Sequence, residues 1–138
     1  MEKILEDFKK VLDLAGVKEH IDIAIEILPA PHKSPSALPS GKKAIYLFKL
    51  GGEYLKIGKV GSKSSARYAS HHYNPKSSGS NLASSLLLDD IGMQNVGKWI
   101  RENTTRINLL VDDDTDPHVV SLLESFLHCR LRPRYEGR

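Results

Sequence analysis

The chain has 138 residues, of which 40% are hydrophobic and 27% charged, and its formal net charge is +3. These values are typical of one globular domain, and the apolar runs are much shorter than the roughly 20 residues that a membrane-spanning helix requires. Cys129 is the single cysteine, which excludes an internal disulfide and a structural zinc site, and the first residues lack the apolar core of a signal peptide. We therefore expect a cytoplasmic protein with no membrane partner.

The charge is spread unevenly along the chain. Residues 1–28 hold seven acidic and four basic residues and carry −3, whereas residues 29–138 hold sixteen basic and ten acidic residues and carry +6. A basic body attracts nucleic acid through the phosphates. Many basic proteins of this size have other partners, so charge alone makes DNA one candidate among several.

The first 40 residues predict a helical extension and a linker. Apolar residues recur at helical spacing from Ile4 to Ala15, and Gly16 can end that helix. Residues 18–28 fit two structures, because four isoleucines alternate as in a strand while the segment also presents one apolar helix face. We favour the helix. The proline- and serine-rich stretch 29–39 predicts an extended linker with little structure of its own.

Residues 41–138 predict a separate α/β domain. Ala44–Leu50 and Glu53–Lys59 are apolar runs around Gly51-Gly52, a pattern that indicates a β-hairpin because glycine supplies the positive φ of a tight turn. The elements expected after it are a short helix through Arg67 and His71, a helix over 82–88 capped by Ser80, a helix over 96–102, a third strand over 106–111, and a helix over 119–131 with Asp116 as N-cap and Pro117 as its first residue. The expected fold is α/β (α+β), with a small, mainly antiparallel three-stranded sheet flanked by helices.

An ordered set of motifs in this domain resembles the GIY-YIG nuclease superfamily. Ala44-Ile45-Tyr46 and Lys56-Ile57-Gly58, nine residues apart, resemble the paired tripeptides that name the family. The later matches are Arg67, His71, Glu124 and the Leu131-Arg132-Pro133-Arg134-Tyr135 tail, which is similar to that of the excision-repair branch. The resemblance runs from residue 44 to residue 136. The departures from the family pattern are Ala44 for the first glycine, Lys56 for the second tyrosine and Glu136 for an asparagine.

The resemblance implies a metal-dependent endonuclease that hydrolyses DNA phosphodiester bonds, in restriction, repair or mobile-element biology. It assigns Tyr46 as general base or water-positioning group and Arg67 as a clamp on the phosphate. A free phenol has a pKa near ~10, so we expect the ammonium of Lys56, across the hairpin, to favour the phenolate. His71 would relay a proton, and Glu124 would be the only protein ligand of one Mg²⁺ or Mn²⁺ ion.

Further basic residues extend the expected DNA-binding surface. They are Lys59, Lys63, His72, Arg132 and Arg134. Each candidate taken alone also fits a structural role, as a packed tyrosine, a surface charge or an exposed helix position. Two other functions fit the same residues: a DNA-binding module of this fold that has lost turnover, or an interaction protein whose acidic N-terminal helix covers the basic face.

Overall fold

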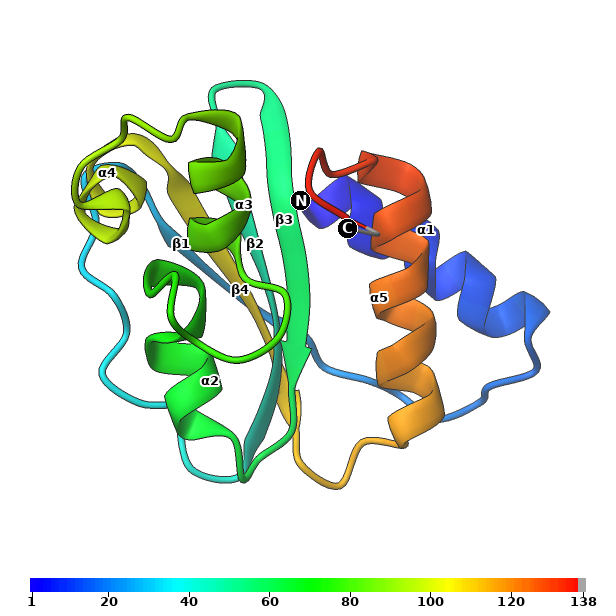
Figure 1. Cartoon of the computed structure of the whole chain (residues 1–138). Helices are drawn as coiled ribbons and strands as arrows, with labels where there is room; N and C mark the ends of the chain where they lie inside the picture. The colour runs from blue at the N-terminus through cyan, green and yellow to red at the C-terminus, as the bar shows by residue number, and fades with distance from the viewer. Residues whose placement is uncertain (137–138) are drawn as a thin grey trace.

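A computed structural model describes residues 1–136 and shows an antiparallel four-stranded sheet between two layers of helices (Figure 1). The strand order is β1-β4-β2-β3. The elements in chain order are α1 (Glu2–Leu14), β1 (Ala24–Leu28), β2 (Lys42–Leu50), β3 (Glu53–Val60), α2 (Ser65–Ala69), the 3₁₀ helix η1 (His71–Tyr73), α3 (Leu82–Asp89), α4 (Val96–Asn103), β4 (Thr105–Asp112) and α5 (Pro117–Leu131). Among residues 1–136, no helix has the length and apolar character needed to cross a bilayer.

The sheet has one strand more than the sequence predicts, because residues 24–28 form β1. The helix favoured for residues 18–28 is therefore wrong. β1 pairs with β4 along its whole length, with Ile25 opposite Leu109. A short segment of alternating isoleucines fits both the two-residue period of a strand and the 3.6-residue period of a helix. Main-chain pairing with a neighbouring strand decides between the two structures.

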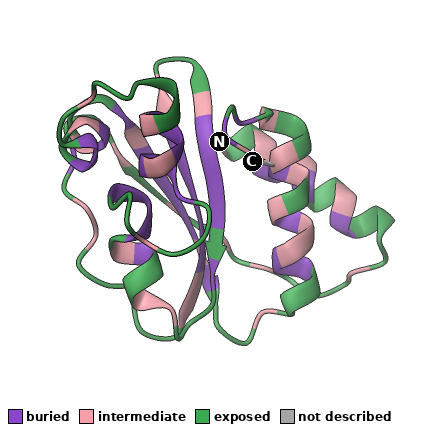
Figure 2. Ribbon diagram, in the orientation of Figure 1, coloured by how far each residue is buried: buried purple, intermediate pink, exposed green. Residues whose placement is uncertain are grey.

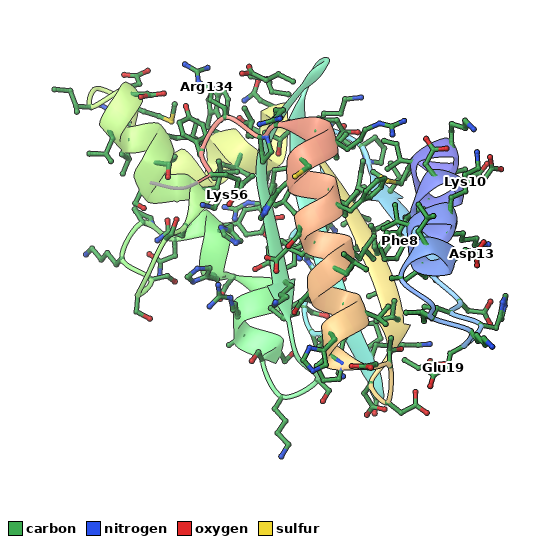
Figure 3. The ribbon with its side chains drawn as sticks, turned by 90° about the vertical axis from the view of Figure 1, so that its right-hand side faces the viewer. Phe8, Lys10, Asp13, Glu19, Lys56 and Arg134 are labelled. Carbon is green, nitrogen blue, oxygen red and sulfur yellow. The ribbon has the colours of Figure 1, made fainter. Side chains whose placement is uncertain are left out.

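The alternation of side chains along β2 separates two hydrophobic cores. Tyr46 and Phe48 face the layer of α2, α3 and α4, whereas Ile45 and Leu47 face α1 and α5. Both faces of the central strands are buried as a result (Figure 2). The second core is completed by Phe8, which Figure 3 shows on the side of α1 that faces the sheet.

Most other predicted elements are confirmed, with small shifts in their ends. The hairpin, the strand over 106–111 and the helices over 82–88, 96–102 and 119–131 are all present. Asp116 caps α5 by accepting a hydrogen bond from the His118 amide, and Pro117 is the first helical residue. The cap of α3 is Asn81 rather than Ser80, because the Asn81 side chain accepts from the Ser84 amide.

The predicted helix through Arg67 and His71 is two shorter helices. α2 ends at Ala69, and His71 begins η1. Ser70 lies between them with a non-helical φ of −127°, and its hydroxyl donates to the Ala66 carbonyl. The side chains of Arg67 and His71 therefore do not share one continuous helix face. His72, rather than His71, contacts Tyr46 of the sheet.

β3 is an edge strand whose free edge is partly covered by the C-terminal tail. The Arg134 amide donates to the Tyr54 carbonyl at 3.0 Å, and the Tyr135 amide donates to the Leu55 carbonyl at 3.0 Å. The strand also contains a bulge, since Phe48 pairs with Lys56 and Lys49 pairs with Tyr54. The extra residue, Leu55, packs in the first core and shifts the alternation of β3.

Candidate active site

A cleft of about 500 Å³ opens at the β3 edge, between α2 and η1 on one side and α5 on the other. The bulge in β3 turns Lys56 toward the face that carries Tyr46, because Lys56 pairs with Phe48. The lining residues are Lys56, Ile57, Gly58, Lys59, Arg67, His72, Ser80, Glu124 and Glu136. A larger hollow of about 620 Å³ lies beside the end of α1. It contains none of the predicted site residues, so chemistry favours the smaller cleft.

Tyr46 lies directly beneath Gly58, its partner across the hairpin. The tyrosine is completely buried. A Cβ atom at position 58 would be 2.8 Å from Cε2 of the ring and 2.9 Å from both Cζ and the hydroxyl oxygen. Only glycine allows this approach, and it places the phenol oxygen directly under the wall of the cleft.

His72 donates a hydrogen bond to the phenol of Tyr46. Its Nδ1 accepts from the Leu82 amide at 3.0 Å, and since an amide can only donate, Nδ1 carries no proton. Burial lowers the pKa of His72 to about 2, so the ring is neutral and its proton is on Nε2. Nε2 lies 3.0 Å from the Tyr46 oxygen. In this tautomer His72 supplies a proton to the bond and cannot accept one from the phenol.

Arg67 acts on the same phenol from the mouth of the cleft. It is exposed on α2, and its guanidinium acts to lower the pKa of Tyr46. Burial has the largest effect and raises the pKa of Tyr46 overall, whereas Arg67 acts to lower that pKa. The His72 donor and the positive charge of Arg67 favour the phenolate, so these two groups oppose the effect of burial.

Lys56 makes its contacts away from the phenol. Its Nζ donates to Ser80 Oγ at 2.8 Å and to the Tyr135 carbonyl at 2.9 Å, and it lies 3.8 Å from a carboxylate oxygen of Glu136. The side chain is buried, and burial lowers the pKa of Lys56. Figure 3 shows Lys56 and Arg134 at the same end of the molecule. The cations that act on the pKa of Tyr46 are instead Arg67 and Arg106.

Glu124 extends from α5 into the cleft and forms an ion pair with Lys59 at 3.0 Å. Lys59 also donates to Ser121 Oγ at 2.9 Å. Among residues 1–136, no group of three or more histidine, cysteine or acidic side chains is arranged to hold a metal ion. The carboxylate of Glu124 is a suitable hard ligand for Mg²⁺ or Mn²⁺, with water and a substrate phosphate filling the remaining positions.

Five predicted residues do not line the cleft, and one of them, Tyr46, lies directly beneath its wall at Gly58. His71 is buried, and its Nε2 donates to the Ser80 carbonyl at 3.0 Å. Lys63 is exposed in the turn that precedes α2, and Arg132 is exposed at the end of α5 with a φ of 49°. Arg134 is exposed on the tail and lies 3.4 Å from Asp89. The cleft itself therefore brings together Lys56, Lys59, Arg67, His72 and Glu124 around Tyr46.

Two residues near the site were not predicted. Ser80 lines the cleft and binds Lys56, but a serine in a polar loop gives no sequence signal. Arg106 is buried over the Tyr46 ring, and the sequence carried a signal for it: Arg106 and Asn108 alternate with apolar residues in a predicted strand.

Searches of the chain against protein-family models, curated proteins and solved structures found no match. The case for a function therefore depends on the residues of the cleft.

Proposed function

We propose that the protein is a metal-dependent endonuclease of the GIY-YIG type that hydrolyses DNA phosphodiester bonds in the β3 cleft. One observation carries the proposal. The oxygen of Tyr46 lies beneath Gly58, where it accepts a hydrogen bond from His72 and is acted on by the charge of Arg67, beside a cleft that also contains the carboxylate of Glu124. The family's characteristic residue types thus meet at one place although they come from separate elements.

The side chains divide the work of hydrolysis. Tyr46, in its phenolate form, accepts a proton from the attacking water, and the His72 donor stabilises that form. Arg67 binds the phosphate through its planar fork as negative charge develops. Lys56 and Lys59 attract the DNA backbone into the cleft. Glu124 would hold a Mg²⁺ or Mn²⁺ ion, which supplies positive charge to the phosphate oxygens.

Cleavage of supercoiled plasmid tests the proposal. We expect nicking in Mg²⁺ or Mn²⁺ and none in chelator. Glu124→Gln keeps the shape of the side chain and removes its charge, so it should abolish cleavage while DNA binding persists. The matched control is Glu102→Gln, because Glu102 also pairs with a lysine, Lys98 at 3.7 Å, but lies on α4 outside the cleft. Full activity of Glu124→Gln would reject the metal ligand, and an inactive wild-type protein would reject the endonuclease.

A DNA-binding module without turnover is the second candidate, and Glu136 favours it. Its carboxylate accepts a hydrogen bond from the Ile57 amide at 3.0 Å and lines the cleft. A negative charge at this place repels a phosphate. Salt-dependent DNA binding without cleavage would support this candidate. Gain of cleavage in Glu136→Asn would show that the carboxylate is the cause of the lost turnover.

A further inference from the structure

Arg106 is a completely buried cation at the centre of the first core. It extends from β4 and is 1% exposed. Its guanidinium donates to Asn108 Oδ1 at 2.8 Å, to the Tyr68 carbonyl at 2.7 Å and to the Tyr73 hydroxyl at 3.3 Å. It also packs over four aromatic rings, with distances from Cζ to the ring centroids of 4.6 Å for Tyr68, 5.0 Å for Tyr46, 5.4 Å for Phe48 and 5.8 Å for Tyr73.

This buried charge has no acidic partner in the part of the chain that the structure describes. The ion pairs among residues 1–136 do not include Arg106. Its hydrogen bonds go to neutral oxygens, and the faces of the rings provide the remaining attraction. A buried charge without a counterion costs stability, because hydrogen bonds and rings replace only part of its hydration.

Asn108 contacts Arg106 at a position where an aspartate would act as the counterion. Its Oδ1 accepts from Arg106, which fixes the orientation of the amide. Its Nδ2 is buried and has no hydrogen-bond partner within residues 1–136. Aspartate has the same shape, would leave no donor stranded and would supply the missing counterion. Asparagine is therefore expected to stabilise the fold less than aspartate would at position 108. A loss of stability of this kind is expected at a residue that serves a functional site.

We propose that Arg106 is a positioning residue whose uncompensated charge holds Tyr46 in place and stabilises its phenolate form. The assignment of Tyr46 as the base rests on the proposed function. The geometry supports the proposal because the guanidinium lies 5.0 Å from the centroid of the Tyr46 ring. Asn108 lies opposite Tyr46 in the pairing of β2 with β4, so a carboxylate there would act on both groups.

Among the charged and titratable groups around Tyr46, Arg106 is the one suited to stabilise the phenolate independently of the substrate. His72 on η1 is neutral, and Glu124 on α5 acts to raise the pKa of Tyr46. Arg67 on α2 lowers that pKa more than Arg106 does, but it is exposed, so water and salt screen its charge and a bound phosphate would engage it. Arg106 is sealed from solvent, and its field at the phenol is therefore less screened and independent of the substrate.

Asn108→Asp tests the proposal because it cancels the field of Arg106 without changing the shape of the core. We expect an unchanged or higher free energy of unfolding, since the buried charge gains a counterion. The single-turnover cleavage rate at neutral pH should fall at least about tenfold, which corresponds to a rise of about one unit in the pKa of Tyr46. The pH profile should move up, and DNA binding should stay within about twofold, because a buried side chain does not touch DNA. Asn103→Asp, on the exposed surface of α4, is the control for the same change in total charge.

A titration of Tyr46 tests the proposal independently of cleavage. Tyrosine labelled with ¹³C at Cζ reports ionisation by NMR, and Tyr46→Phe identifies the signal. We expect Tyr46 to ionise at lower pH in the wild-type protein than in Asn108→Asp, and Arg106→Met to behave as Asn108→Asp does. Equal titration curves would overturn the inference, as would a Tyr46 that stays protonated in both proteins until they unfold. If the wild-type protein cuts no DNA, the proposed function fails, and this titration still decides the role of Arg106.

Discussion

His71 and His72 are adjacent in the chain, but their imidazoles have different partners. The family spacing points to His71, whose Nε2 donates to the Ser80 carbonyl. His72 reaches Tyr46 because α2 ends at Ala69 and the chain turns again in η1. His72, rather than His71, therefore contacts Tyr46, and it does so as a hydrogen-bond donor.

Separate substitution of the two histidines distinguishes their roles. His72→Leu removes a donor from the Tyr46 oxygen, and loss of one donor to a developing anion typically slows a reaction by about 10²–10³-fold. We expect a loss of this size in single-turnover cleavage, with DNA binding retained. His71→Gln keeps a donor for Ser80 and should change the rate by only a few fold. An equal loss in both variants would argue that the two residues act through folding.

Helix α1 belongs to the core of the molecule. Its apolar face buries Phe8 in the second core, and Asp7 pairs with Arg130 of α5 at 2.7 Å. No residue of α1 lines the β3 cleft. These contacts indicate a stabilising helix rather than a cover for the site.

Truncation of Phe8 measures that contribution. A buried phenylalanine changed to alanine typically costs about 3–5 kcal/mol, so we expect Phe8→Ala to lower the free energy of urea unfolding by this amount. The control, Leu14→Ala, changes a side chain that is 90% exposed and should have little effect. The salt dependence of DNA binding should be the same in both variants. Tighter binding by Phe8→Ala at low salt would instead indicate that the acidic helix screens the basic face.

Elements with strong local signals could be predicted from the sequence, and the others depend on distant contacts. Gly51-Gly52 fixes the hairpin turn, and Asp116 with Pro117 marks the start of α5. Residues 24–28 carry a pattern that fits two periods, and only pairing with β4 resolves it. In the site, the motif spacing singles out Tyr46, Arg67 and Glu124. The alternation of Arg106 with apolar residues indicates that it shares a strand face with Asn108, but only the folded structure shows that it lies over the Tyr46 ring.

Buried neutral histidines should make folding sensitive to acid. Burial lowers the pKa of His32, His71 and His72, in the last case to about 2. Below the unfolded pKa of about 6.5 the unfolded chain binds protons that the folded protein does not. Stability that is fully present above this pH is therefore lost as the pH falls, at up to about 1.4 kcal/mol per pH unit for His72.

Urea unfolding between pH 7.5 and 5, values chosen around the ~6.5 pKa of a free imidazole, measures this loss. We expect the free energy of unfolding to decrease steadily with falling pH in the wild-type protein. His72→Leu should be less stable at neutral pH and should show a shallower decrease. A slope that the substitution leaves unchanged would mean that carboxylates, not His72, set the acid limit.

The two edge strands of the sheet, β1 and β3, differ in how far their free main-chain groups are covered. The β3 edge is occupied in part by the chain's own tail, whereas β1 pairs only with β4 among the described residues. An open strand edge is a template for aggregation, and Ile27 on it is 56% exposed. Three features limit that hazard: β1 has five residues, Glu26 places a charge in its middle, and Pro29 follows it directly with Pro31 two residues later. We therefore expect the protein to stay dispersed at the high concentrations that NMR requires, with any growth of fibrils beginning at β1.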